Sequence, residues 1–186
     1  MTDRRTGILD AALSVLAHDG MRALTHRAVD AAAGIAPGST SYYFRTRAAL
    51  VAGCIDRLVE IDRGLATPSV AVSADVAGFL DLIVAAGEVM AGPERTRTLA
   101  RYELSVAAMH DDGLRVLLAE GGTAVARLAA AMLADLGATD PEASARQVLA
   151  AFDGVLFSAM VRGEERVGAT VRAVVGPVLA AQPGLA

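Results

Sequence analysis

Apolar residues recur every three or four positions along almost the whole chain, in segments separated by glycine, proline or helix-capping residues. This spacing places the apolar side chains on one face of an α-helix. The first segment, residues 3–18, carries Ile8, Leu9, Leu13 and Leu16, and Gly20 follows it as a break. Further segments cover residues 26–33, 36–44, 46–67, 74–92, 94–110, 114–137, 142–163 and 164–181, the fourth helix ending near Thr67 and Pro68. The pattern therefore predicts an all-α protein of about nine helices.

Composition supports packed helices and a division of the chain into two parts. Of the 186 residues, 54% are hydrophobic and only 4% aromatic, whereas strand-rich domains draw on aromatic and β-branched residues. A chain of this length can form a small module and a larger one. We predict an N-terminal three-helix domain at residues 1–50 and a C-terminal helical bundle at residues 51–186.

Charge is distributed unevenly between these two parts. The whole chain has a net charge of −4, and all of its basic side chains are arginines. Residues 1–50 carry six arginines and four acids, a net charge of +2, whereas the rest carries eleven arginines and seventeen acids, a net charge of −6. A basic head on an acidic body indicates that the head faces a polyanion.

Two short helices joined by a glycine turn occupy the segment from Thr25 to Phe44. The Thr25 hydroxyl can cap the first of them, and Gly34 follows at the turn. Pro37 stands in the first turn of the second, where its missing amide hydrogen does no harm. This spacing is typical of a helix-turn-helix that reads DNA.

The second short helix has the surface of a DNA-reading element. Residues 38–43 are small or hydrogen-bonding, which allows the helix to enter a major groove and its hydroxyls to reach bases or phosphates. Arg27, Arg45 and Arg47 lie nearby in the sequence and can neutralise phosphates. The alternative is an ordinary capped helical corner whose hydroxyls and arginines are merely solvated.

The stretch from Ile8 to Leu50, ILDAALSVLAHDGMRALTHRAVDAAAGIAPGSTSYYFRTRAAL, resembles the DNA-binding domain of the tetracycline-repressor-like (TetR) family of bacterial regulators. The resemblance implies a recognition helix that begins at residues 37–39 and a pair of aromatic residues that grip the DNA backbone. Ser41 and Tyr43 depart from the tyrosine and histidine common in relatives, so the operator sequence is not transferred. The residues to which the resemblance assigns DNA contacts, together with Arg27 from the motif, are Thr25, Arg27, Pro37, Gly38, Ser39, Thr40, Tyr42, Tyr43 and Arg47.

Small residues and branched aliphatics gather in the last two predicted helices. In the resembling family these helices pair with their copies as a four-helix dimer interface, and a symmetric dimer suits a palindromic operator of double-stranded DNA. The alternative is a core within one chain. The predicted interface residues are Ala150, Gly154, Ser158, Val171, Val174 and Val178.

The remaining bundle is predicted to hold a small apolar or amphipathic effector that releases the homodimer from its operator. The alternative is that the ligand makes the protein an activator of transcription. Arg101, Glu103 and His110 are candidates to orient a polar group of that effector. The predicted apolar lining consists of Met90, Tyr102, Met109, Phe152 and Leu156, each of which has ordinary core packing as its alternative.

Other classes of protein have little support in the sequence. The three histidines, His18, His26 and His110, are scattered, and Cys54 has no evident base, so we expect no enzyme, cofactor or metal site. A purely structural or protein-binding helical bundle is the second alternative. No uninterrupted apolar run of about 18 residues is present, and we expect a cytoplasmic protein without a membrane segment.

Overall fold

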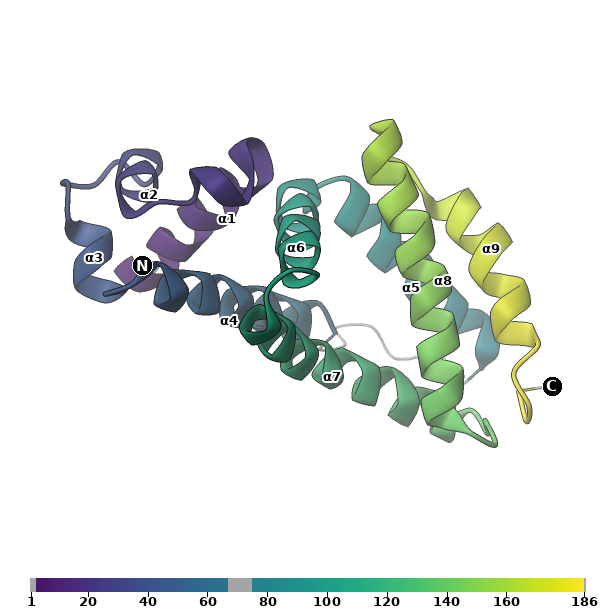
Figure 1. The fold of residues 1–186 in the computed structure, drawn as a ribbon. Coiled ribbons are helices and arrows are strands. Elements are labelled where there is room, and N and C mark those ends of the chain that lie inside the picture. Colours follow the sequence, from purple (N-terminus) through teal and green to yellow (C-terminus); the bar gives the residue numbers. More distant parts are fainter. Residues whose placement is uncertain (1–2, 67–74, 186) are drawn as a thin grey trace. The chain divides into compact units, whose positions relative to one another are not determined.

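The computed structural model describes residues 3–66 and 75–185, and within these ranges it consists of nine helices and no strand (Figure 1). The all-α prediction is therefore confirmed. The predicted end of the fourth helix, near Thr67 and Pro68, lies outside the described residues. The helices are α1 (Arg4–Ala23), α2 (His26–Ala32), α3 (Ser39–Tyr43), α4 (Arg47–Ala66), α5 (Val76–Ala91), α6 (Arg95–Ala108), α7 (Asp112–Asp135), α8 (Pro141–Arg162) and α9 (Gly168–Ala180).

Two boundaries in the N-terminal part differ from the predicted ones. The helical hydrogen bonding of α1 continues to Ala23, but Gly20 has a non-helical backbone with φ 77° and ψ 178°, so the predicted break is a kink inside the helix. The second short helix begins at Ser39 and not at residue 36. Pro37 and Gly38 form a turn before it, because Gly38 adopts φ 90°, a left-handed conformation that glycine allows at little cost.

The chain forms two compact units. The first comprises Met1–Asp62 and Thr96–Gly121, and the second comprises Arg63–Arg95 and Gly122–Ala186. These units do not coincide with the predicted boundary between residues 50 and 51. The reason is that α6 supplies Ala100 and Leu104 to the same buried cluster as α1 and α4, although it is far from them in sequence.

The core of the first unit fixes the two short helices to α1 and α4. Ile8, Leu13 and Leu16 of α1 are almost fully buried together with Leu50 and Leu58 of α4. Polar contacts add to this apolar packing. Arg57 of α4 donates to Asp10 of α1 at 2.9 Å, and Arg101 of α6 forms a two-pronged ion pair with Asp62 of α4 at 2.8 and 2.6 Å.

Gly53 allows α4 to approach Phe44 closely. A Cβ atom at this position would lie 2.7 Å from Phe44 Cε1 and 2.9 Å from Leu9 Cδ2. We therefore expect Gly53→Leu to lower the free energy of unfolding by about 3 kcal/mol through overpacking. Gly7→Leu is the matched control, because Gly7 is exposed in α1 and a Cβ there would meet no atom within 4 Å, and we expect it to raise stability by about 0.5–1 kcal/mol. Urea denaturation measures the free energy of unfolding of both variants. Equal changes at Gly53 and Gly7 would contradict the close packing of α4 against Phe44.

Helices α5, α8 and α9 pack together in the second unit (Figure 1). Gly87 of α5 permits the close approach, since a Cβ there would lie 3.1 Å from Val171 and 3.3 Å from Phe152. Glu88 of α5 caps the start of α9, where its Oε1 accepts hydrogen bonds from the backbone amides of Val167 at 3.2 Å and Gly168 at 2.6 Å.

Cys54 and α7 each bear on an expectation from the sequence. Cys54 is fully buried, and burial raises the pKa of its thiol to about 12, so the thiol stays protonated at neutral pH. By length and composition alone, α7 is apolar enough to cross a membrane, which the search for uninterrupted apolar runs did not predict. One such helix is weak evidence for a membrane span.

Candidate nucleic-acid interface

Helix α2 begins at the residue predicted to cap it. Thr25 has an extended backbone, and its Oγ1 accepts a hydrogen bond from the Ala28 amide at 3.1 Å. The Thr25 side chain is exposed, and so is the Arg27 side chain two residues along. The hydroxyl hydrogen of Thr25 therefore remains available to a phosphate oxygen while its oxygen caps the helix.

A buried carboxylate on α2 fixes the turn that leads into α3. Asp30 Oδ2 accepts from the Gly38 amide at 2.7 Å, and Oδ1 accepts from the Thr40 amide at 2.8 Å. Asp30 is only 4% exposed. The sequence reasoning did not identify this residue. The sequence did contain a signal for it: Asp30 follows the apolar Val29 in α2 and precedes Gly38 by eight residues.

Hydrogen bonds hold the Asp30 carboxyl in its charged form. The Thr40 side chain lowers its pKa most, the Thr40 and Gly38 amides and the nearby His26 lower it further, and burial opposes them. The net result is a pKa below the ordinary value of 3.8. A carboxylate whose pKa is lowered by folding stabilises the folded state at pH values above 3.8, and this contribution is lost as the pH falls through the lowered pKa.

We expect Asp30→Asn to reduce the free energy of unfolding at pH 7 by about 1.5–3 kcal/mol, because a charge-assisted hydrogen bond is replaced. The difference from the wild type should shrink as the pH falls from 3.8 toward the lowered pKa, since the unfolded carboxylate binds a proton first and the stabilisation by the folded carboxylate is lost over this interval. Denaturant titrations at pH 7 and at pH 3 measure it. A difference that stays constant between the two pH values would show that the charge of Asp30 contributes nothing.

The outer surface of α3 exposes hydroxyl groups and aromatic rings. Tyr42 is 76% exposed and Tyr43 is 38% exposed, their rings meeting edge to face at 5.3 Å between centroids. Ser41 is also exposed. These three side chains point away from the core. Tyr42 is therefore a surface residue, whereas Phe44 is 3% exposed and belongs to the core.

Two predicted contact residues of α3 have internal roles. Thr40 is fully buried, so its side chain is not placed to touch DNA, and this corrects the sequence-based assignment. The physical reason is that Thr40 faces α2, where its amide meets Asp30. Ser39 is half-buried and its Oγ donates to the Ala36 carbonyl at 2.6 Å, which stabilises the turn.

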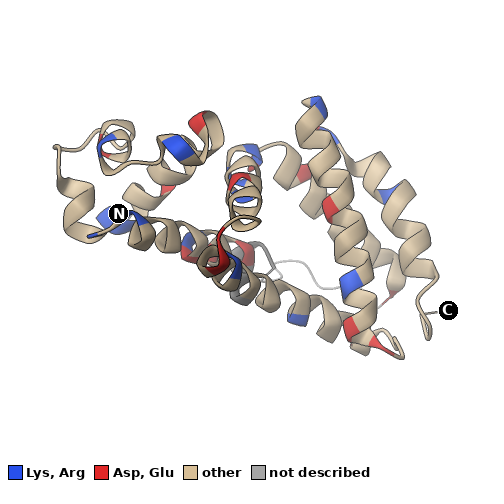
Figure 2. Ribbon diagram, viewed as in Figure 1, with Lys and Arg blue, Asp and Glu red and all other residues tan. Residues whose placement is uncertain are grey.

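Arg47, predicted as a phosphate ligand, is exposed and also makes contacts within its own chain. Its Nε donates to the Leu24 carbonyl at 3.2 Å and its Nη2 donates to the Met21 carbonyl at 2.5 Å. The guanidinium thus ties the start of α4 to the connection between α1 and α2. Arg27 and Arg45 are exposed, and they stand on α2 and directly after α3, which itself carries no charged residue (Figure 2).

The predicted ligand residues are divided between the two units. Tyr102 and Met109 belong to the first, and Met109 is 69% exposed, so it does not lie in an apolar interior there. Phe152 and Leu156 are buried in the second unit, and Met90 is half-buried. The pocket therefore stays a prediction. Of the proposed orienting groups, Arg101 pairs with Asp62.

The predicted dimer residues separate into an inner and an outer set. Ala150, Gly154 and Val174 are exposed, and Val178 is half-buried. Val171 is fully buried against the other helices of its own unit, so it belongs to the core and not to an outer surface. Periodicity alone did not distinguish the two, because both faces of α9 carry valines.

Helix α8 exposes an apolar stripe that the sequence reasoning only partly identified. Phe157 is 49% exposed and Val161 is 72% exposed, and with Ala150 and Gly154 they follow steps of four, three and four residues. These four residues, called the α8 stripe below, have the spacing of a coiled-coil seam. A Cβ at Gly154 would meet nothing within 4 Å, so the surface at this position of the stripe is open.

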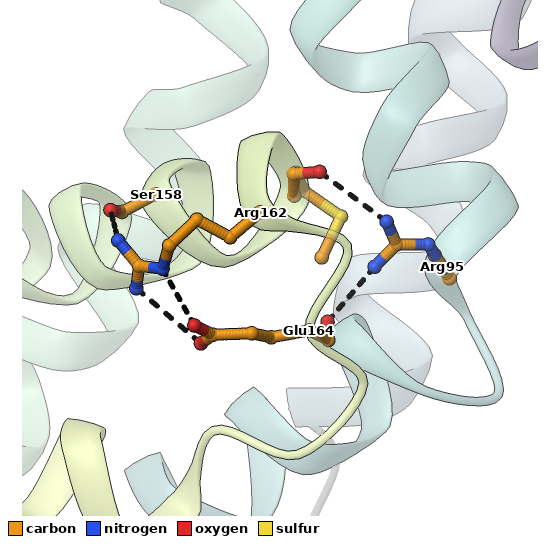
Figure 3. Close-up of polar contacts among 5 residues, drawn as sticks. Arg95, Ser158, Arg162 and Glu164 are labelled. Atoms are coloured by element: carbon orange, nitrogen blue, oxygen red, sulfur yellow. Dashed lines mark hydrogen bonds and ion pairs between the residues drawn. The ribbon is translucent and has the colours of Figure 1, made fainter.

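Polar contacts flank the C-terminal end of this helix (Figure 3). Arg162 donates to Ser158 Oγ and to the Glu164 carboxylate, the latter at 2.6 Å. Arg95 donates to the backbone carbonyls of Glu164 at 3.0 Å and Met160 at 3.4 Å. Ser158, predicted as an interface residue, thus has a partner in its own chain, and the last turn of α8 is held in place.

Comparison with known protein families finds a matching family model for each of the two parts of the chain. Residues 8–54 match the family model described as bacterial regulatory proteins, tetR family, and residues 74–181 match the model of the tetracyclin repressor-like C-terminal domain. A comparison with curated proteins found no match. The second family model alone spans more than half of the chain.

Solved structures share the fold over nearly the whole length. A putative TetR-family transcriptional regulator from Rhodococcus sp. has 22% identity and a TM-score of 0.81, covering 96% of this chain and 98% of that chain. A TetR transcription regulator from Haloarcula marismortui ATCC 43049 has 18% identity and a TM-score of 0.79, covering 98% and 99%. The multidrug binding protein EbrR, complexed with malachite green, has 30% identity and a TM-score of 0.68, covering 95% and 98%.

The helix-turn-helix geometry, the two family models and the full-length structural similarity agree, and the chain belongs to the tetR family of DNA-binding transcriptional regulators.

Proposed function

We propose that this protein is a ligand-responsive repressor that binds a palindromic operator as a homodimer in the cytoplasm. The observation that carries the proposal is the exposed face of α3, where Ser41, Tyr42 and Tyr43 are exposed, together with the exposed arginines Arg27 on α2 and Arg45 directly after α3. A helix of this kind enters the major groove of B-DNA, which is about 12 Å wide.

The contacts divide into those that position the helix and those that read bases. Arg27 and Arg45 neutralise phosphates, and the tyrosine hydroxyls donate to phosphate oxygens on either side of the groove. Thr25 adds a hydroxyl at the start of α2, where the free amide hydrogens also favour an anion. Ser41, which is exposed, is proposed to meet a base edge. Ser39 could add only an acceptor, because its hydroxyl hydrogen is donated to a backbone carbonyl.

The dimer is proposed to form through the α8 stripe and the exposed Val174 of α9. An aromatic residue surrounded by small side chains at coiled-coil spacing is suited to self-complementary packing about a two-fold axis. Such a dimer presents two heads to the two halves of a palindrome, with half-site centres about 34 Å apart or a multiple of that.

Effector binding is proposed to release the operator by linkage. The multidrug binding protein EbrR has been solved in complexes with ethidium, with proflavin and with malachite green. We propose that the present chain also binds a small apolar or amphipathic molecule in its C-terminal bundle. Such a ligand weakens DNA binding by the ratio of its affinities for the two conformations of the dimer.

Binding to duplex DNA from the region upstream of the protein's own gene tests the proposal. Fluorescence anisotropy at several salt concentrations should show tight binding with a steep salt slope, and a scrambled duplex of the same composition should bind at least a thousandfold more weakly. Ethidium and malachite green, added to the protein alone, test the effector site by thermal shift. Equal affinity for both duplexes would support a helical protein that does not read DNA.

A further inference from the structure

Helix α3 is too short to maintain its own conformation. It contains five residues, Ser39–Tyr43, whereas isolated helices of fewer than about 12 residues are marginal in water. Most of its outer side chains are exposed and contribute little burial. The conformation of the DNA-reading element must therefore be fixed by contacts to its two ends from elsewhere in the first unit.

Two residues of α2 supply such contacts. His26 and Asp30 are four residues apart in α2, a separation that places both side chains on one face of the helix. Asp30 binds the N-terminal end of α3 through the Gly38 and Thr40 amides at 2.7 and 2.8 Å. These amides precede or open the helix and have no carbonyl partner one turn back, so the carboxylate satisfies groups that a short helix leaves free.

His26 binds the opposite end of the same helix. Its Nε2 lies 2.7 Å from the backbone oxygen of Phe44, the residue that terminates α3. Because a carbonyl oxygen only accepts hydrogen bonds, Nε2 carries the hydrogen and donates it. The Phe44 ring is buried in the core at the same point, which leaves this carbonyl in a defined position.

We propose that His26 and Asp30 act as positioning residues that hold α3 in its DNA-binding conformation before DNA arrives. This pair, the α2 clamp, rests on the proposed function, because it deepens the role assigned to α3. Neither side chain touches DNA. The α2 clamp contributes by preorganising α3. A five-residue segment that becomes ordered only on binding DNA loses conformational entropy at that step, whereas a segment that is already fixed does not.

The α2 clamp predicts a particular pattern of effects on DNA binding. Sequence-specific binding requires α3 to enter the groove in one orientation, whereas non-specific binding depends mainly on arginines that contact phosphates. Removing one half of the clamp should therefore weaken binding to the specific duplex about tenfold or more. Binding to non-specific DNA should change by no more than about twofold, because Arg27 and Arg45 are unaltered.

The test uses the full chain with Asp30→Asn, His26→Ala and the double variant. The matched controls are Asp19→Asn and His18→Ala, which remove the same groups at exposed positions of α1. His26→Gln is the rescue variant, because its side-chain amide can donate from nearly the position of Nε2. The specific probe is a duplex that the wild-type protein selects from a random pool, and the non-specific probe is sheared genomic DNA.

Two readouts decide the outcome. Hydrogen exchange without DNA should be at least tenfold faster at residues 38–44 in the clamp variants, near wild-type in His26→Gln, and unchanged in the controls. The double variant should show less than the sum of the single effects, because both residues hold one helix. Unchanged protection of α3, or parallel losses of specific and non-specific affinity, would overturn the proposal. If the wild type selects no duplex, the proposed function fails, and the exchange measurement still decides on the clamp.

Discussion

Replacing Phe157 and Val161 together by glutamate is expected to convert the proposed dimer into a monomer with the 19.0 kDa mass of one chain. Both side chains are exposed on the α8 stripe, at 49% and 72%, so the change leaves the core of the second unit intact. A buried aromatic anchor at the centre of an interface contributes about 2 kcal/mol or more, and charges facing their own copies across a two-fold axis repel each other.

Operator binding should fall with the dimer, by more than about a hundredfold. A monomer holds only one half-site, so the second head no longer binds at the high effective concentration that the dimer provides. Sedimentation velocity measures the mass, and anisotropy measures the affinity. Val116→Glu is the matched control, because Val116 is 58% exposed on α7 and lies outside the proposed interface. A Phe157/Val161 variant that remains dimeric would place the dimer interface elsewhere on the chain.

The double substitution Tyr42→Phe with Tyr43→Phe is expected to lower operator affinity by more than about a hundredfold. It removes two hydroxyl groups and keeps both rings, including their edge-to-face contact at 5.3 Å. Each hydrogen bond from a neutral donor to a charged phosphate contributes about 1.5–3 kcal/mol, and about 2.7 kcal/mol corresponds to a hundredfold change in affinity.

Three properties of the tyrosine variant separate lost contacts from lost structure. The melting temperature and the dimer mass should stay at the wild-type values, because both rings are exposed in the isolated protein. The loss should be much larger on the specific duplex than on non-specific DNA, because only an α3 helix seated in the groove brings both hydroxyl groups to phosphate oxygens, and non-specific binding depends mainly on the arginines. An affinity within twofold of the wild type would show that α3 does not approach DNA through this face.

The sequence was sufficient to predict the helices because their signals are local. Apolar residues at helical spacing, Thr25 as a cap and Gly20 as a break all act within a few residues of their position in the chain. The motif from Thr25 to Phe44 could be located for the same reason. The start of α3 was predicted three residues too early, because Gly38 adopts its positive φ in a turn that is held by the distant Asp30.

The direction of individual side chains could not be predicted from the sequence. Thr40 was assigned to DNA, yet it is buried against α2. The hydrogen bonds that Arg47 donates to the carbonyls of Met21 and Leu24 were also not predicted from the sequence. Val171 and Val174 have the same chemistry, and only the packing of α5 against α9 distinguishes the buried one from the exposed one. Phe157 was missed because a step of four residues from Gly154 leads to Ser158 instead.

Selection of duplexes from a random DNA pool by the purified protein, followed by sequencing, tests the central claim most directly. The account predicts enrichment of an inverted repeat whose half-sites are centred about 34 Å apart or a multiple of that, bound by one dimer or more. A pool that remains random after several rounds, or that yields a single half-site bound by one chain, would contradict it.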